Sequence, residues 1–493
     1  MNKSHSINSI AKISLERNKT TNKIEDLKSQ TDFIKAYEKL EYYAKNGYAS
    51  IDDEAKKFIL KSFGIFDRPA TPKQFMLRVR IKSGRINIAQ AVAIANIAKE
   101  YGKDYIDITT RMQIELRFLK IEDIPSVLSK LDAVGITTFQ TGVDNFRNIL
   151  TDPLDGFAKD NIIECANIVQ KMQDIFLKKP EWITTLPRKF NAGISGSTTN
   201  RCNIFGQDCA FVLAKKNDIY GFNIYLGGKV GKIAKCANIF VAPDEVLSVF
   251  VAIIELFKEY GFRDNRNKNR LFFLLEAVGI NTFGAAIRER AGIDFMQAGE
   301  LCNEGVEFEQ KGSVLLKKGT VATHCAIPAG IFSGTDLLAL ANQCSENSQI
   351  CFTVEQNLYI IGEKEQNSIE HKFINYTNNY LTNIVACAGS EHCPFGVIEN
   401  KSDAIKLAEY LGKNIEFTKP LRMCWSACPK GCGIHAAGDI GFVGTKKAVD
   451  GKICLAVDIY TGAKLNGNGH EGQVYAKGIL LSELNEFVAK MLK

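Results

Sequence analysis

Cysteine is the residue type whose spacing most clearly predicts chemistry in this chain. Cys387 and Cys393 form a C-x5-C pair, and Cys428 and Cys432 form a C-x3-C pair, with Cys424 shortly before them. Four thiolates are the ligand set of a cubane iron–sulfur cluster. The spacing therefore predicts such a cluster. Structural zinc, which usually takes cysteine pairs two to four residues apart, and inert buried thiols are the alternatives.

Helix and strand patterns precede these cysteines and must position them. Residues 1–30 are polar and we expect them to be mobile, whereas residues 31–64 have apolar residues at helical spacing. From residue 75 the pattern predicts a strand and turn (75–84), a helix ending at Gly102, a strand (105–116) and a second helix (121–135). This β-α-β-α order is typical of the ferredoxin-like fold.

Two internal repeats indicate that the chain is duplicated. Residues 81–84 (IKSG) and the helix pattern after them return as residues 327–330 (IPAG) and a second helix pattern. Residues 208–212 (DCAFV) return as residues 439–443 (DIGFV). Within each repeat, several matching blocks keep an equal offset in residue number. The modules therefore follow the order A-B-A′-B′, with a period too long for a solenoid. Chance similarity of short apolar strings is the alternative.

Composition is that of an ordinary globular protein. Of the 493 residues, 45% are hydrophobic and 24% are charged. The length of the chain suggests about three domains' worth of material. No continuous apolar run reaches the length of a membrane span. The formal net charge of +7 favours an anionic ligand or an acidic partner protein, not a nucleic acid. The N-terminus lacks a secretory signal, so we expect a cytoplasmic protein with reduced thiols, a transit peptide being the alternative.

The cysteine strings resemble a known family. Residues 386–397 (ACAGSEHCPFGV) and 427–444 (ACPKGCGIHAAGDIGFVG) are similar to the sirohaem–[4Fe-4S] signature of assimilatory nitrite and sulfite reductases, C-x5-C followed by C-P-x-x-C-G. That family duplicates a ferredoxin-like module and a cofactor module, which is similar to the A-B-A′-B′ order. The resemblance runs from about residue 35 to the C-terminus. It implies that Cys387, Cys393, Cys428 and Cys432 hold the cluster, and that Cys432 also bridges to the sirohaem iron.

The resemblance also assigns basic residues to an anion site. It implies that Arg78, Arg147 and Lys189 surround the substrate and that Arg111 pairs with sirohaem carboxylates. Met112 stands where the family has Gln, so one cofactor or water contact lacks its usual residue. Residues 263–279 are similar to the family's sirohaem-clamping segment, whose basic members here are Arg266, Lys268 and Arg270. Solvated surface charge is the alternative for each of these residues.

Residue 191 bears on the choice of oxyanion. Sulfite reductases usually read R-K-F-K here, whereas this chain reads R-K-F-N with Asn191, as ferredoxin-nitrite reductases do. Sulfite is largely a dianion near neutral pH and benefits from another cation, whereas an amide N–H donor is enough for the nitrite monoanion. The resemblance therefore implies nitrite reduction. Sulfite reduction on the same scaffold is the alternative, and Asn191 is otherwise a plain loop residue.

A dinucleotide enzyme and a non-catalytic zinc- or cluster-binding protein are competing interpretations. Gly467, Gly469 and Gly472 match G-x-G-x-x-G after a strand-like string and before a helix-like one. The chain ends at Lys493, which leaves no room for the second strand of a βαβ unit, so we expect a turn or a loop near the cofactor instead. Without its own nicotinamide or flavin site, the enzyme needs an external donor, which in the family is ferredoxin.

These inferences combine into one expected architecture and activity. We expect an α+β fold in which duplicated ferredoxin-like modules alternate with two cofactor-binding α/β modules around a central sirohaem–cluster site. The expected segments are a polar tail and helical wrap (1–64), ferredoxin-like module 1 (65–140), sirohaem-binding module 1 (141–300), ferredoxin-like module 2 (301–372) and sirohaem/[4Fe-4S]-binding module 2 (373–493). We expect a monomeric oxidoreductase that reduces nitrite to ammonia with six electrons and binds neither nucleic acid nor membrane.

Overall fold

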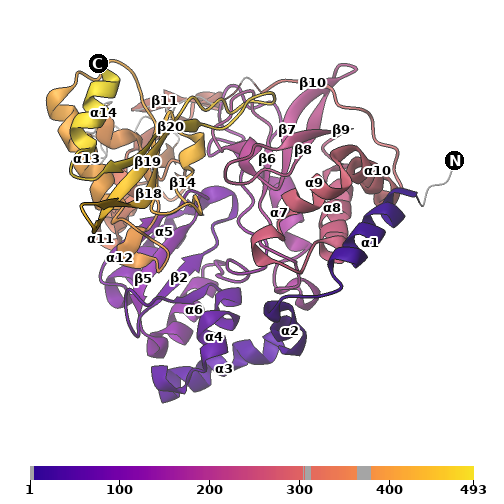
Figure 1. Ribbon diagram of the computed structural model, residues 1–493, viewed down its shortest axis with the longest axis horizontal. Coiled ribbons are helices and arrows are strands. Elements are labelled where there is room, and N and C mark those ends of the chain that lie inside the picture. The colour runs from indigo at the N-terminus through magenta and orange to yellow at the C-terminus, as the bar shows by residue number, and fades with distance from the viewer. Residues whose placement is uncertain (1–4, 304, 306–311, 363–378) are drawn as a thin grey trace. The chain divides into compact units, whose positions relative to one another are not determined.

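The chain forms the helices and strands shown in Figure 1. These elements belong to two compact units. The computed structural model describes residues 5–303, 305, 312–362 and 379–493. The first unit comprises residues 1–66, 78–83 and 137–306, and the second comprises residues 67–77, 84–136 and 307–493. The expected boundary between residues 372 and 373 lies outside the described residues, and the division into five segments stays a prediction.

The first unit is built on a sheet in the order β10-β7-β8-β9, with β6 parallel to β7. Asn217 and Asp218 join β7 to β8 with φ values of 48° and 63°, as the two-residue turn of a twisted hairpin requires. The strands are β6 (Ala192–Ser195), β7 (Cys209–Lys216), β8 (Ile219–Leu226), β9 (Lys235–Val241) and β10 (Glu300–Leu301). The helices are α1 (His5–Arg17), α2 (Lys23–Gln30), α3 (Phe33–Asn46), α4 (Asp53–Lys57), α7 (Ala166–Asp174), α8 (Val246–Tyr260), α9 (Leu271–Val278) and α10 (Ile280–Ala291).

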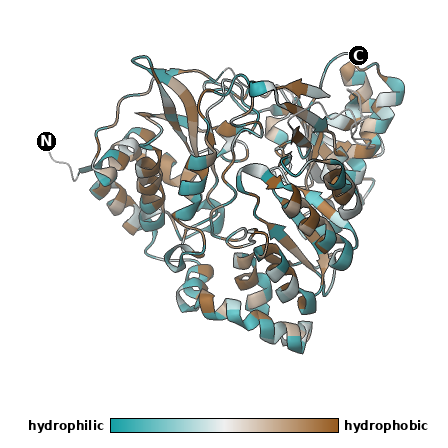
Figure 2. Ribbon diagram, turned by 180° about the vertical axis from the view of Figure 1, so that it is seen from behind, coloured by the Kyte–Doolittle hydropathy of each residue, from teal (hydrophilic) through white to brown (hydrophobic). Residues whose placement is uncertain are grey.

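Helix α8 carries much of the core of this unit. Val246, Phe250, Ile253 and Phe257 recur every three or four residues and are all fully buried. Such a stripe packs on the apolar face of a sheet, here together with buried residues of β7, β8 and β9. Figure 2 shows hydrophobic and hydrophilic residues alternating along the helices.

The N-terminal residues form packed helices, so the expectation of a mobile tail is wrong for residues 5–30. Ile10 of α1 is fully buried in the same core as α8. Arg17 at the end of α1 binds Asp264 at 3.0 Å. The side chain of Asn22 caps α2, and that of Asp32 caps α3. A polar helix with one apolar stripe does not stand out from a mobile tail by composition alone.

Two sheets with the ferredoxin-like pattern, in the orders β1-β2-β5-β4-β13 and β11-β12-β15-β14-β3, belong mostly to the second unit. Helices α5 (Ile88–Tyr101), α6 (Ile124–Asp132) and α11 (Gly334–Gln343) accompany them. The strands are β1 (Ile65–Asp67), β2 (Phe75–Val79), β3 (Arg85–Asn87), β4 (Tyr105–Ile108), β5 (Ile114–Leu119), β11 (Ser313–Leu315), β12 (Val321–Cys325), β13 (Ile331–Ser333), β14 (Gln349–Phe352) and β15 (Leu358–Gly362). The predicted α+β fold with duplicated ferredoxin-like modules is confirmed.

Each of these sheets ends in a strand supplied by the other repeat. β13 belongs to the second repeat but pairs with β4 of the first, with Ile331 opposite Asp107. β3 belongs to the first repeat but pairs with β14 of the second, with Arg85 opposite Cys351. The two ferredoxin-like repeats are therefore interlocked by a strand exchange.

The first predicted repeat is confirmed at the level of single dihedral angles. The 3-10 turns Lys82–Gly84 and Pro328–Gly330 have Ser83 and Ala329 at the same φ of 53°. The next residues, Gly84 and Gly330, have φ values of 70° and 68°, which glycine adopts without strain. Both pairs occupy matching places in the repeated strings IKSG and IPAG.

Residues 105–116 form parts of two strands, β4 and β5, not the single strand expected. Met112 between them has a φ of 54°. The hydroxyl of Thr109 accepts from the backbone N–H groups of Arg111 at 3.3 Å and Gln113 at 3.2 Å. This polar turn contains no glycine or proline to mark it in the sequence. Arg111 therefore lies at the tip of a hairpin.

The C-terminal sheet of the second unit has the order β16-β17-β18-β19-β20 and repeats the sheet of the first unit. β17 and β18 are parallel with Met423 opposite Ile440, as β6 and β7 are with Ala192 opposite Cys209. Both strands keep the offset that relates the strings DCAFV and DIGFV, so the second predicted repeat is confirmed. The elements are β16 (Ile384–Ala386), β17 (Met423–Ser426), β18 (Ile440–Val449), β19 (Lys452–Thr461) and β20 (Gln473–Leu480), with helices α12 (Gly389–His392), α13 (Lys401–Asn414) and α14 (Leu484–Leu492).

The glycine string near the C-terminus is a strand connection. It joins β19 to β20, so the expectation that it precedes a helix is wrong. Lys464 and His470 exchange two backbone hydrogen bonds of 2.8 and 2.9 Å across it, which closes a turn. It therefore lacks the strand–loop–helix context of a dinucleotide site.

Among the described residues, no single helix has the length and apolar composition of a membrane span, although α9 and α10, bent by 105°, reach them as a pair.

Candidate functional site

The four predicted cluster ligands lie in two loops at one edge of the C-terminal sheet. β16 and β17 are neighbouring parallel strands, with Ala386 opposite Trp425, so the chain leaves both strands at the same edge. Cys387 follows β16 directly, and Cys428 follows β17 by two residues. Parallel pairing thus brings together two cysteine loops that are distant in the sequence.

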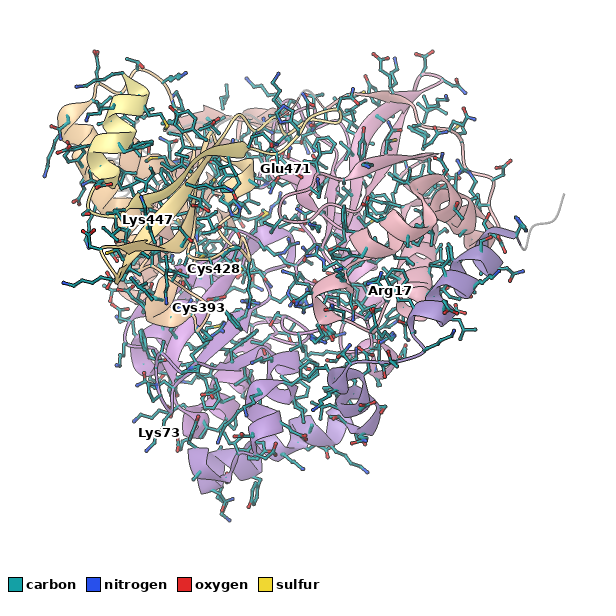
Figure 3. The ribbon with its side chains drawn as sticks, viewed as in Figure 1. Arg17, Lys73, Cys393, Cys428, Lys447 and Glu471 are labelled. Atoms are coloured by element: carbon teal, nitrogen blue, oxygen red, sulfur yellow. The ribbon has the colours of Figure 1, made fainter. Side chains whose placement is uncertain are left out.

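Short turns return the chain to the other two cysteines. The N–H of Cys393 donates to Gly389 at 2.9 Å, which closes the single turn of α12. The thiols of Cys393 and Cys432 both lie close enough to Cys387 and to Cys428 to interact with them electrostatically. Figure 3 shows Cys393 and Cys428 as neighbours. The structure therefore gathers all four cysteines.

Burial favours the protonated form of two of these thiols, Cys387 and Cys428. It raises the pKa of Cys387 to about 12, and the charges of Cys432 and Cys393 add to this effect. Burial also raises the pKa of Cys428. Backbone N–H groups oppose the shift, including that of Ala427, which donates to the Sγ of Cys387 at 3.2 Å. Metal ions are the centres that deprotonate such thiols.

The chemistry and backbone of the loops fit a [4Fe-4S] cluster. The donor set is four thiols, and N–H groups directed at sulfur are typical of cluster sites. A Cβ on Gly433 would lie 1.7 Å from the carbonyl oxygen of Trp425 and 3.2 Å from the nitrogen of Cys387, so glycine is needed for the two loops to meet. In the described part of the chain, no three His, Cys, Asp or Glu residues are placed to hold a single metal ion.

The Arg111 hairpin contacts the loop of Cys432. The hydroxyl of Thr110 donates to the carbonyl oxygen of Cys432 at 3.0 Å. Arg111 is half-buried at the same tip, and Met112 is fully buried. Two residues predicted to bind sirohaem, Arg111 and Cys432, are therefore brought close together, whereas their cofactor roles stay predictions.

The first unit has the same sheet edge without the cysteines. Leu150 pairs with Gly193 as Val385 pairs with Cys424, so residue 152 corresponds to residue 387. Between β6 and β7 the offset of the second repeat holds, since the 3-10 turn Ile204–Gly206 matches His435–Ala437. Residues 197 and 201 thus correspond to residues 428 and 432.

An ion pair occupies these corresponding positions. Arg201 donates to Asp152 at 2.7 Å and to Asp160 at 2.9 Å. Asp152 is fully buried, and Ser197 stands where the other copy has Cys428. In the first unit, a salt bridge therefore occupies the place that the four cysteines surround in the repeated C-terminal sheet.

Arg80 joins the three basic strings within the first unit. It is 3% exposed and donates to the carbonyl oxygens of Phe146 at 2.9 Å and Arg147 at 3.3 Å. The N–H of Arg147 donates to Phe190 at 2.8 Å, and the N–H of Phe190 donates to Asn145 at 3.1 Å. The strings that carry Arg78, Arg147 and Lys189 therefore converge.

The three residues predicted to surround the substrate are all half-buried. Arg78 donates to the carbonyl oxygen of Thr141 at 3.1 Å and lies over the ring of Phe66 at 4.8 Å. Arg147 donates to the carbonyl oxygen of Val143 at 3.0 Å. The roles of Arg78, Arg147 and Lys189 stay predictions.

Asp144 forms ion pairs with several basic residues, a role that the sequence did not predict. It is fully buried and accepts from both terminal nitrogens of Arg266 at 2.7 Å. Lys28 and Arg188 lie 3.4 and 3.5 Å away. Burial opposes ionisation of Asp144, but these cations outweigh it and lower its pKa. The signal for this role in the sequence was that Asp144 lies in the same short string as the basic residue Arg147.

Asp208 plays the corresponding part for Asn191. It accepts from the backbone N–H of Asn191 at 2.8 Å and from Arg270 at 2.6 and 2.9 Å. The Asn191 side chain is buried, and its Oδ1 has no hydrogen-bond partner among the described residues. Arg270, like Arg266, thus binds a protein carboxylate, whereas Lys268 is exposed. Their predicted contacts with sirohaem stay predictions.

The histidines beside the cysteines make structural contacts. His435 hydrogen-bonds the hydroxyl of Ser426 at 3.0 Å, and burial lowers its pKa to about 4. His392 packs against the rings of Tyr105 and Phe118. Within the described residues, these contacts are those of structural side chains.

Known proteins are similar to this chain in sequence and in fold. Residues 142–295 and 377–493 match the nitrite and sulphite reductase 4Fe-4S domain, and residues 68–134 match the nitrite/sulfite reductase ferredoxin-like half domain. The ferredoxin–nitrite reductases of Synechococcus elongatus and Leptolyngbya laminosa are 32% and 30% identical, each over 96% of both chains. The structure of Mycobacterium tuberculosis NirA has the same fold, with a TM-score of 0.90, 24% identity and coverage of 100% of this chain and 95% of that one.

Proposed function

The chain belongs to the family of the nitrite and sulphite reductase 4Fe-4S domain, and from this membership we propose that it reduces nitrite to ammonia with electrons from reduced ferredoxin. The observation that carries the proposal is the gathering of Cys387, Cys393, Cys428 and Cys432 at one sheet edge. Four thiols with backbone N–H donors suit one-electron transfer. Nitrogen passes from the +3 to the −3 state, so each nitrite takes six electrons and eight protons and gives ammonium and two waters.

Two cofactors follow from this proposal, a [4Fe-4S] cluster and sirohaem. When bound, they supply one-electron steps and an open iron position for the substrate. Cys387, Cys393, Cys428 and Cys432 would hold the cluster, and the exposed Cys432 thiolate is the one proposed to serve the sirohaem iron as well. Arg111 would neutralise sirohaem carboxylates, because buried carboxylates need charge partners. Three further candidates for this task are Arg266, Lys268 and Arg270.

The oxyanion would be bound by cations placed in advance of the reaction. Arg78, Arg147 and Lys189 are proposed to hold nitrite, and Lys189 to pass protons to it. Asn191 would add a neutral amide. Its backbone N–H is held by Asp208, which in turn binds Arg270. Donors fixed before reaction stabilise the developing charge without the cost of reorganisation.

A steady-state assay with reduced methyl viologen as donor tests the function. We expect a higher kcat/KM for nitrite than for sulfite, together with a Soret band and a red-region band in the visible spectrum. A preference for sulfite would assign the activity to sulfite reduction on the same scaffold. Absence of both bands from protein produced with iron and the tetrapyrrole would remove the cofactor assignment.

A further inference from the structure

Asn400 ties the two cysteine loops together. It is fully buried, and its Nδ2 donates to the carbonyl oxygens of Cys387 at 2.9 Å and Trp425 at 3.0 Å. The same nitrogen lies 3.4 Å from the Sγ of Cys387. One side-chain amide thus contacts the ends of β16 and β17 and one thiol.

The conformation of Asn400 indicates that these contacts are specific. Its φ of 49° and ψ of −63° form a combination that residues with a Cβ rarely adopt. Its acceptors also fix the orientation of the amide, because a flipped amide would direct its oxygen at two carbonyl oxygens. A strained, buried residue is retained only where the surrounding structure holds it in place.

The Sγ of Cys387 receives several donors. Ala427 donates its backbone N–H at 3.2 Å, and Gly389 contributes another backbone N–H. Asn400 adds a side-chain donor, which can be removed by substitution whereas the backbone donors remain. Hydrogen bonds to cluster sulfurs are among the factors that set the reduction potentials of iron–sulfur centres.

We propose that Asn400 is a positioning residue that raises the reduction potential of the cluster through its hydrogen bond to the Cys387 thiolate. This inference rests on the proposed [4Fe-4S] cofactor. Reduction adds one electron from the external donor to the cluster and increases the negative charge on sulfur. A donor to that sulfur stabilises the reduced state more than the oxidised state, and no proton leaves Asn400.

The first unit offers a matched control in Asn161. Its Nδ2 donates to Asp155 at 3.2 Å, to the carbonyl oxygen of Ile163 at 3.1 Å and to Ser197 at 3.1 Å. Asn161 is 2% exposed, so its substitution has a comparable structural cost. It touches no cysteine sulfur in these contacts, so its substitution should not alter the cluster.

Potentiometric titration followed by electron paramagnetic resonance tests the inference on the holoenzyme. Asn400→Leu should lower the midpoint potential of the cluster by about 59 mV, which is about a tenfold decrease in the equilibrium constant for one-electron reduction. Asn161→Leu should leave the potential unchanged. An unchanged potential in cluster-loaded Asn400→Leu, or an equal shift in Asn161→Leu, overturns the inference. If wild-type protein shows no cluster signal, the proposed function fails instead.

A second measurement needs no variant. In wild-type protein containing ¹⁵N-labelled asparagine, pulsed resonance of the reduced cluster should detect coupling to a side-chain ¹⁵N nucleus. Absence of this coupling overturns the inference even if Asn400→Leu fails to fold.

Discussion

Cys432 differs from the other three proposed ligands because it is exposed whereas they are half-buried. Cys432→Ser replaces a soft thiolate with a poor iron ligand, so we expect loss of the cluster and of its coupling to sirohaem. Iron content and the visible spectrum measure both effects. Cys424→Ala is the control, because Cys424 is buried within β17, and it should keep its iron. Normal spectra and full activity in Cys432→Ser would refute the ligand assignment.

Lys189 carries the clearest prediction for the anion site. Lys189→Ala should keep the cofactors but lower kcat/KM for nitrite by about 10²-fold or more, the usual scale for one electrostatic stabiliser. The exposed Lys179→Ala is the matched control and should change little, because a solvated charge is screened. Unchanged turnover of Lys189→Ala at low nitrite would place this residue outside the pocket.

Asn191 is the residue expected to set substrate choice. Asn191→Lys should shift the ratio of specificity constants toward sulfite by roughly 1–3 kcal/mol, or about 5- to 150-fold. A new ammonium favours a dianion over a monoanion, although burial of the lysine and repulsion from Lys189 reduce the gain. Asn191→Gln keeps the amide and should keep the nitrite preference. A ratio that does not move in Asn191→Lys would remove residue 191 as the discriminator.

The clustered cysteines stand out in the sequence, but the carboxylates that bind the basic residues of the proposed anion site do not. Cysteine spacing is local, so four candidate ligands can be read directly from two strings. Asp144 and Asp208 acquire their roles only when Arg266 and Arg270 fold onto them from distant parts of the chain. The recurrence of Asp208 as Asp439 in the repeat was a usable signal, since Asp439 accepts from the backbone of Arg422 in the same manner.

At the scale of elements, local patterns predicted the helices of the first ferredoxin-like module but missed α1, α2 and the pairing of strands. Helices α5 and α6 lie where the apolar spacing placed them. The hairpin of β4 and β5 was missed because its turn depends on the Thr109 hydroxyl, not on glycine or proline. The exchange of β3 and β13 was missed because the partner of an edge strand is set by contacts between distant segments.

Helix α1 provides a test of packing at this scale. Ile10→Ala should lower the free energy of unfolding by about 2–4 kcal/mol, because Ile10 is fully buried in the core of the first unit. Leu15→Ala on the same helix is the control. Leu15 is 75% exposed, so its change should stay within about 0.5 kcal/mol. Denaturant titration measures both, and equal values would mean that α1 does not dock as described.

At the scale of the whole molecule, the duplication has left one copy with thiols and the other with an ion pair. Arg201→Met should destabilise the protein by about 3–5 kcal/mol, because it leaves the buried Asp152 without its cation. Addition of Asp152→Asn should recover most of this loss, since the fully buried charge is then gone and only the partly exposed Asp160 lacks its cation. Thermal unfolding of the single and double variants measures the effect. Iron content should equal that of wild type in both.

The strand exchange between the ferredoxin-like repeats also governs how the chain is made. β4 is complete once residue 108 has left the ribosome, but its partner β13 begins at Ile331. At about 5–20 residues per second, translation of the intervening segment takes on the order of ten seconds or more. During that interval the nascent chain presents an open strand edge, which pairs with any strand it meets. We therefore expect chaperones to bind the unfinished chain before β13 is made.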